Sequence, residues 1–440
     1  MTPLGWFGIV RLGLVQMALG AIVVLTTSTL NRVMVVELAL PALVPGLLVG
    51  IHYAVQLSRP RMGFGSDRSG RCTPWILGGM AVLACGGTLA AAATAWMATQ
   101  RAAGLALAAL AFLLVGLGVS ACGTSLLVLL AKRVAPERRA PAATIVWMMM
   151  IIGFAVTAGL AGRWLDPYTP ARMVMVSGSV AVLACAVVLL ALWRLEGHAA
   201  QTGAAPAEPK LRFLDALQQV WQEPTARRFT VFVFVSMLAF SAQDLILEPF
   251  AGAVFGLTPG ATTQLSGLQH GGVLLGMIAA SLAGSRLRIG SLRQWTIGGC
   301  IASSLALAAL VAGGIVGPPW PLHATVFALG AANGAFSIAA IGSMMRLAGA
   351  GRAQREGVRM GLWGASQAIS FGVGGLAGAL ASDVARRFID STGAAYATVF
   401  AAEALLFLWA AALATGIDTE ASARRTRRWA WTRSTPTMPS

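Results

Sequence analysis

The fold of this chain is decided by one short stretch, GFGSDRSGR at residues 63–71, which separates two apolar runs. Its glycines allow a tight turn. The carboxylate of Asp67 suits the positive N-terminus of a helix, and two arginines accompany it. A charged turn of this kind predicts a loop between two membrane spans.

The composition extends this interpretation to the whole chain. The 440 residues are 57% hydrophobic and 11% charged, with a mean hydropathy of +0.74. Because soluble domains carry charges on about a quarter of their residues, this chain cannot cover itself with a water-compatible surface. Backbone polar groups must be paired internally in hydrocarbon, and the apolar runs lack the alternation of barrel strands, so we predict membrane-spanning helices.

Apolar runs of membrane-spanning length recur in two sets of six, with a polar stretch between them. The first set falls at about 12–30, 41–58, 74–95, 104–131, 142–161 and 173–193, and the second at about 229–247, 264–284, 295–316, 322–345, 360–381 and 395–416. We therefore predict an all-α integral membrane fold of about twelve transmembrane helices in two six-helix halves. The expected divisions are an N-terminal bundle at 1–194, a linker at 195–228, a C-terminal bundle at 229–416 and a basic tail at 417–440.

The basic residues indicate the orientation, because Lys and Arg near span ends stay on the cytoplasmic side. If the N-terminus is inside, only six of the 32 basic residues lie outside: Arg32, Arg101, Arg163, Arg172, Arg386 and Arg387. We therefore predict that both termini are cytoplasmic. The net charge of +16 is scattered in short groups between apolar runs, a pattern that reflects topology and excludes a nucleic-acid partner. The basic tail favours contact with anionic membrane lipid.

Two charged segments stand at equivalent places, just after the first span of each half. The first contains Asn31, Arg32 and Glu37, and the second contains Gln243, Asp244 and Glu248. We predict that they form an outer polar lock in which Arg32 meets Asp244 or Glu248. The alternative is that both segments are solvated span ends.

Polar residues inside spans are costly and are candidates for function. His52 lies well inside the second span, and His270 begins the eighth. One interpretation is hydrogen-bonded packing. The other is axial ligation of a Mg-tetrapyrrole by a neutral imidazole, and spacing alone does not decide between them.

The loop at 63–71 resembles the G-x-x-x-D-R-x-G-R signature of the major facilitator superfamily. The matching positions are Gly63, Asp67, Arg68, Gly70 and Arg71. The resemblance implies a cytoplasmic gate loop in which the aspartate caps a neighbouring helix and pairs with arginine. Residues 284–290 are a degraded copy in the second half, as expected for parallel repeats.

Four segments resemble the PucC/LhaA family, the bacteriochlorophyll delivery branch of that superfamily: residues 30–38, 52–61, 243–250 and 360–368. The resemblance implies a light-harvesting complex assembly factor in the photosynthetic, intracytoplasmic inner membrane of a phototrophic bacterium. It implies bacteriochlorophyll as the bound group. It also implies antenna polypeptides and the terminal bacteriochlorophyll synthase as partners. His52 would be the axial ligand to the pigment Mg, with His270 as a second pigment-binding candidate.

Two other classes of protein were weighed against this one. An exporter of a lipophilic small molecule is the alternative, because few titratable groups lie away from the span ends, chiefly Glu403, and this disfavours proton-coupled transport of polar solutes. An enzyme is disfavoured because the sixteen acids contain no Asp-rich cluster for Mg-diphosphate, and we identify no catalytic residues.

Overall fold

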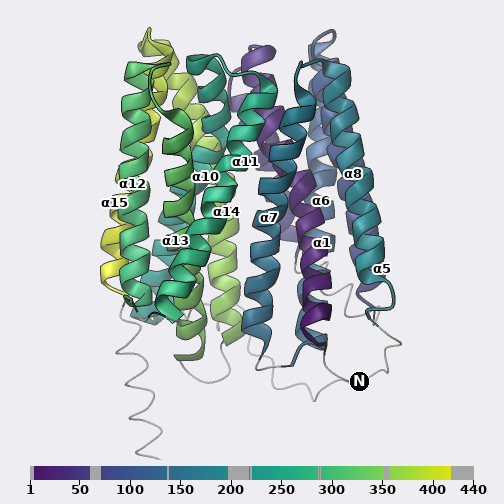
Figure 1. Ribbon diagram of the computed structural model, residues 1–440, viewed down its shortest axis with the longest axis vertical. Helices are drawn as coiled ribbons and strands as arrows, with labels where there is room; N and C mark the ends of the chain where they lie inside the picture. Colours follow the sequence, from purple (N-terminus) through teal and green to yellow (C-terminus); the bar gives the residue numbers. More distant parts are fainter. Residues whose placement is uncertain are drawn as a thin grey trace, which may run out of the picture.

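The computed structural model describes residues 4–59, 71–135, 138–196, 218, 221–285, 287, 289–350 and 356–417. Every regular element within these residues is a helix, and the long helices run side by side as an upright bundle (Figure 1). Apolar sequence and helix therefore coincide, because a helix pairs its own backbone groups.

The elements of the first half are α1 (Trp6–Val24), η1 (Leu25–Thr29), α2 (Leu30–Arg32), η2 (Val33–Glu37), α3 (Leu43–Val55), η3 (Gln56–Ser58), α5 (Thr73–Trp96), α6 (Arg101–Arg133), α7 (Arg139–Leu165) and α8 (Pro170–Leu192). Those of the second half are α10 (Pro224–Phe255), α11 (Pro259–Ser285), α12 (Leu292–Val316), α13 (Leu322–Ala350), α14 (Glu356–Phe388) and α15 (Thr392–Thr415). The segment from α1 to η2 is one continuous helix of 32 residues, the same length as α10 at the start of the second half.

Within the described residues, 11 helices are long and apolar enough to cross a membrane, and Leu43–Ser58 is a shorter apolar helix. The prediction of about twelve spans is confirmed. Most helices extend past the apolar runs, and this corrects one placement. His270 does not begin its span, because α11 starts at Pro259 and carries His270 near the middle of its length.

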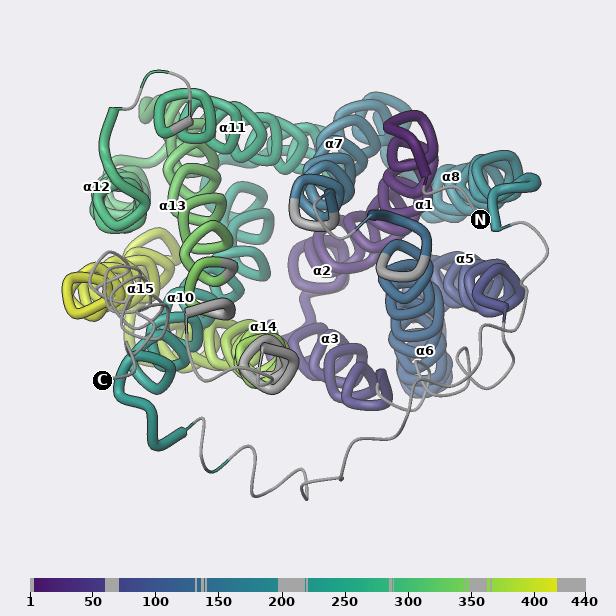
Figure 2. Tube along the Cα trace, turned by 90° about the horizontal axis from the view of Figure 1, so that it is seen from below, coloured from purple at the N-terminus to yellow at the C-terminus, as the bar shows by residue number. Residues whose placement is uncertain are grey.

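The two halves have separate hydrophobic cores. One cluster draws all its buried side chains from residues 229–417, and another draws all of its own from residues 9–195. Seen down the bundle axis, the halves meet at two contacts, one between α7 and α11 and the other between α3 and α14 (Figure 2). We call the end of the bundle where α1 begins the near end, and the opposite end the far end.

Glycines allow a close helix crossing in the second half, between α11 and α13. A methyl group at Gly276 would clash with the carbonyl oxygen of Ala331, and one at Gly334 would clash with that of Val273. Because no hydrophobic force joins helices in lipid, such backbone approach supplies the packing contact. Close backbone packing at these glycines therefore holds α11 and α13 together within the second half.

Candidate functional site

The first helix reaches the second half through widened turns near its far end. Both η1 and η2 are π-helical, so that the N–H of Leu38 donates to the carbonyl of Val33 at 3.0 Å. Beside this region, the hydroxyl of Thr29 shares a 2.9 Å hydrogen bond with that of Thr263 on α11. Single π turns inside helices are frequent at functional sites. Here they lie at the contact between the halves.

Asn31 binds a backbone group that the second half leaves without a helical partner. Pro249 lies inside α10 and has no N–H, so the carbonyl of Leu245, four residues earlier, lacks its usual donor. The side-chain nitrogen of Asn31 donates to this carbonyl at 2.5 Å. Both residues are buried. Asn31, in the first half, thus supplies the hydrogen bond that the carbonyl of Leu245 lacks within α10 of the second half.

Arg32 binds the C-terminus of α10, at the far end of the bundle. Its Nη2 donates to the carbonyl of Leu257 at 2.6 Å, just past the left-handed Gly256 that ends α10. A cation is favourable at a helix C-terminus. The guanidinium passes over Gly252, where a Cβ would stand 3.0 Å from its nitrogens.

The ion pair of Arg32 differs from the predicted one. Its Nη1 pairs with Glu37 of the same helix, and the described residues show no pairing of Arg32 with Asp244 or Glu248. The reason is that Glu37 follows one π turn later and points back at Arg32, whereas the two acids lie further along α10 toward the membrane centre. Tyr168 lies beside this pair, and burial, reinforced by the carboxylate of Glu37, raises the pKa of its phenol to about 12.

The acids of the second half form a separate buried group. Glu248 of α10 and Glu403 of α15 are each 2% exposed. The hydroxyls of Thr262 and Ser266 on α11 lie near the carboxylate of Glu248, whereas that of Glu403 has no hydrogen-bond partner among the described residues. The side-chain amide of Gln243 is likewise buried and without a partner there. Asp244 lies within electrostatic reach of Glu403. Because each unpaired polar group in a protein interior costs free energy, these positions are candidates for binding a polar ligand or water.

His52 lies on α3, which packs against α6 of the first half and α14 of the second. Its Nε2 lies 2.8 Å from the side-chain nitrogen of Gln56, and its ring meets that of Tyr53 edge-on. Nδ1 is buried without a partner among the described residues. Because the amide nitrogen of Gln56 only donates, Nε2 accepts and Nδ1 carries the hydrogen, so neither nitrogen offers a lone pair to a metal in this arrangement. The side chain is also only 2% exposed.

His270 lies at the junction of the halves. Its Nδ1 lies 2.8 Å from the carbonyl of Ser266, and since a carbonyl only accepts, Nδ1 carries the hydrogen. Nε2 then holds the lone pair and has no hydrogen-bond partner in the described part of the chain. The ring meets that of Phe154 on α7 edge-on, with centroids 4.9 Å apart. A donor bond from one imidazole nitrogen to a backbone carbonyl is typical of metal-ligating histidines.

The predicted gate loop falls mostly outside the described residues, which exclude Gly63, Asp67, Arg68 and Gly70. Arg71 is described and precedes α5. The N-terminus of α5 is capped by Glu196, whose carboxylate accepts from the N–H of Cys72 at 2.5 Å and of Thr73 at 2.8 Å. Sequence reasoning missed this cap. The sequence signal that could have predicted it is an acidic residue, Glu196, just past the end of the span at 173–193.

A second missed carboxylate joins the halves at the far end. Asp383 of α14 binds backbone N–H groups at the start of α3, which has no side-chain cap of its own. Together with Asn31 and Arg32, it makes the far end a polar seam between the halves. The hydrogen bonds of this far-end seam run mainly to backbone groups.

The comparisons with known proteins agree with this architecture. A family model described as PUCC protein matches residues 29–421. The "Bacteriochlorophyll synthase 44.5 kDa chain" of Rhodobacter capsulatus is 53% identical over 96% of this chain and 98% of its own. "Protein PucC" of Cereibacter sphaeroides is 30% identical over 91% of this chain and 90% of its own.

Solved structures with the same fold are transporters. A bacterial homologue of the human lysosomal transporter Spinster superposes with a TM-score of 0.67 at 15% identity, covering 95% of this chain and 96% of that one. The peptide transporter POT in complex with sulfate gives 0.68 at 16% identity, covering 95% and 97%. At this identity the likeness establishes the fold, which is that of the major facilitator superfamily.

Proposed function

Because this chain belongs to the PUCC protein family, we propose that it binds bacteriochlorophyll and helps to load the pigment into light-harvesting antenna polypeptides. The family links the chain to the pigment and light-harvesting system. The name of the R. capsulatus relative connects that protein to bacteriochlorophyll synthase. The proposal extends this connection to the present chain as a carrier of pigment.

The role is proposed to be non-catalytic. The fold is shared with transporters, whose task is to hold and release a ligand between two halves. A chain of this kind that works beside the terminal synthase would account for a relative named as a synthase chain. The setting would be the photosynthetic inner membrane, with both termini cytoplasmic.

The observation that carries the proposal is the state of His270. Its Nδ1 hydrogen is held by the Ser266 carbonyl, which leaves the Nε2 lone pair for a metal. A chlorophyll-type pigment supplies a Mg ion that takes a neutral imidazole as its axial ligand. His270 fits this requirement better than His52, because it contacts Phe154 where the two halves meet and is 8% exposed, against 2% for His52. We therefore propose His270 as the pigment ligand; His52 would serve only after giving up its bond from Gln56.

Purification in mild detergent from a host that makes bacteriochlorophyll tests the proposal. The absorbance spectrum of the purified protein should show bound pigment, and the same protein from a host without the pigment should lack that absorbance and bind pigment when it is added. A protein that stays free of pigment in both preparations, and instead exports a lipophilic compound from cells or vesicles, would overturn the proposal in favour of the exporter.

A further inference from the structure

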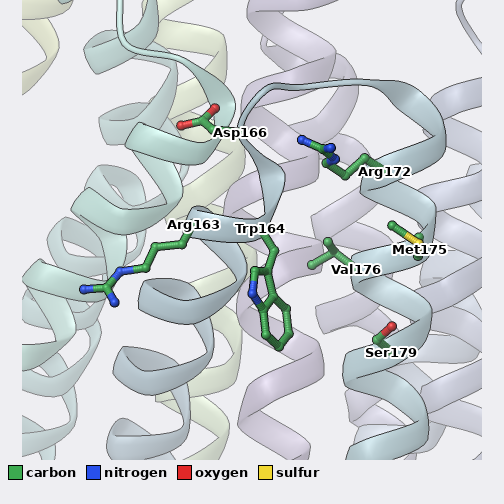
Figure 3. A pocket seen from close by; sticks show the side chains of 7 residues that line it. All are labelled: Arg163, Trp164, Asp166, Arg172, Met175, Val176 and Ser179. Carbon is green, nitrogen blue, oxygen red and sulfur yellow. The ribbon is translucent and has the colours of Figure 1, made fainter.

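We infer that a groove between α7 and α8, at the far end of the bundle, binds an anionic membrane phospholipid through the phosphate of its headgroup. The groove is distinct from the proposed pigment site, because neither His270 nor His52 lines it. Figure 3 shows the groove, with side chains from the end of α7, the connecting turn and the start of α8.

The cavity has a volume of about 350 Å³, within the range of roughly 300–1,000 Å³ that is usual for small-ligand sites. Its rim is formed where α7 ends at Leu165 and α8 begins at Pro170. The ends of membrane spans lie at the depth of lipid headgroups. The cavity is therefore placed to receive a headgroup.

The rim carries two arginines, Arg163 and Arg172. Arg172 is held in place by a 2.9 Å bond from its Nη1 to the carbonyl of Pro167, which leaves its other nitrogens to donate elsewhere. It stands in the first turn of α8, where the helix dipole disfavours a cation. A phosphate between the arginine and the helix start would remove that conflict and would accept charge-assisted hydrogen bonds.

The positions of these arginines also need an explanation from topology. In the predicted orientation, Arg163 and Arg172 are two of only six basic residues on the outer side. Basic residues are disfavoured there unless something compensates for them. Arg32 has its own partner in Glu37. An anionic lipid in the opposite leaflet would compensate for Arg172, whereas the side chain of Arg163 extends away from Arg172 (Figure 3).

The wall of the groove is apolar and continues into the membrane-facing surface. Trp164 is 61% exposed and hangs between the two helices, facing Met175, which is 63% exposed (Figure 3). Below them, exposed apolar side chains follow at helical spacing: Leu160 and Val156 on α7, and Val182 and Leu183 on α8. An acyl chain attached to the bound headgroup would lie along these two stripes, which a soluble anion would not use.

The carboxylate of Asp166 is engaged with the second half. Its Oδ2 accepts from the hydroxyl of Thr258 at 2.9 Å, and its Oδ1 is buried, out of reach of a ligand that stays in the groove. Recognition of the headgroup therefore rests on its phosphate and negative charge.

Native mass spectrometry of the purified full chain, titrated with phosphatidylglycerol, tests the inference. We expect one tightly retained lipid in the wild type. Arg172→Gln should weaken retention about tenfold, the effect of one lost hydrogen bond to a charged group, and Arg172→Lys should restore part of it. Arg101→Gln is the matched control, because Arg101 also begins a far-end helix but does not line the groove.

A second pair of variants tests the acyl chain. Trp164→Ala should also weaken retention, whereas Trp193→Ala, at the near end of α8 and similarly exposed, should not. Equal retention in Arg172→Gln and Arg101→Gln would overturn the inference. So would displacement of the lipid by inorganic phosphate at equal concentration, which would assign the groove to a soluble anion. Phosphatidylcholine bound as tightly as phosphatidylglycerol would overturn the selection of an anionic lipid.

Discussion

Asn31 donates a 2.5 Å hydrogen bond to the carbonyl of Leu245, which is the carbonyl that Pro249 deprives of its helical donor. Pro249 and Asn31 each account for the presence of the other. A proline inside a membrane helix needs a substitute donor for the freed carbonyl, and a buried asparagine needs an acceptor. The bond ties the first helix of one half to the first helix of the other.

This pairing predicts a dependence between Asn31 and Pro249. Asn31→Leu should lower the free energy of unfolding by about 1–3 kcal/mol, because it leaves a buried carbonyl unpaired. In a Pro249→Ala background, the N–H of Ala restores the helical bond, and the same change at Asn31 should cost much less. Thermal unfolding of the four proteins in detergent measures the coupling. Equal costs in both backgrounds would show that the asparagine does not serve the freed carbonyl.

A second prediction concerns the partner of Arg32. Arg32→Glu should destabilise the fold by about 3 kcal/mol, the lower end for a broken buried pair, because Glu37 is partly exposed. Adding Glu37→Arg should recover part of the loss. Adding Asp244→Arg instead should recover none, since Arg32 does not pair with Asp244. Rescue by the second combination and not by the first would assign the pair to the opposite half.

A third prediction concerns the carboxylate cap between α14 and α3. Asp383 accepts from the N–H of Ala42 at 2.9 Å and of Leu43 at 2.7 Å. Asp383→Ala should cost about 1 kcal/mol, as for other lost helix caps, and Asp383→Asn should cost less because its amide oxygen still accepts. Asp390→Ala removes an exposed acid close to the end of the same helix and serves as the control. The melting temperatures of the three variants measure the contribution of the cap. Identical values for Asp383→Ala and Asp390→Ala would show that the cap does not stabilise the fold.

A fourth prediction concerns the crossing of α11 and α13. Gly276→Ala should destabilise the second half by about 1–3 kcal/mol through overpacking, because the added methyl meets the carbonyl of Ala331. Gly271→Ala in the same helix meets no atom within 4 Å and should be neutral or slightly stabilising. The two variants share the same gain in helix propensity, so their difference in unfolding free energy isolates the crossing. Equal unfolding free energies for the two variants would show that α11 and α13 do not pack closely at Gly276.

A fifth prediction separates the two histidines. His270→Phe should remove most of the bound pigment, because it removes the Nε2 lone pair while keeping the ring contact with Phe154. His52→Phe should remove less, since His52 Nε2 already contacts Gln56. The pigment-to-protein ratio after purification gives the comparison, and the melting temperature controls for folding. A larger loss from His52→Phe would reverse the assignment.

Much of the site could be located from sequence, but not its bonds. The segments around Arg32 and Asp244 were recognisable as charged span ends at equivalent places in each half. The donor and acceptor of each bond were not, because several acceptors are backbone carbonyls or carboxylates far along the chain: Leu257 lies 225 residues from Arg32, and Asp383 lies 340 residues from Leu43. Pro249 was a visible sign of a freed carbonyl at Leu245, and it was overlooked.

The sequence by itself determined that this protein lies in a membrane, that it has two halves of about six helices, and that it belongs to a pigment-linked family. Hydropathy and length are local properties, and lipid forces each apolar run to pair its own backbone as a helix. Only the tertiary structure decided that Arg32 pairs with Glu37, that Asn31 serves the carbonyl freed by Pro249, and that His270 presents Nε2. The Asn31 bond depends on which helix faces meet across the two halves, and no single stretch of sequence contains both of its sides. The Arg32–Glu37 pair and the His270–Ser266 bond each lie within one helix, but only the folded structure shows which of the available partners each side chain takes.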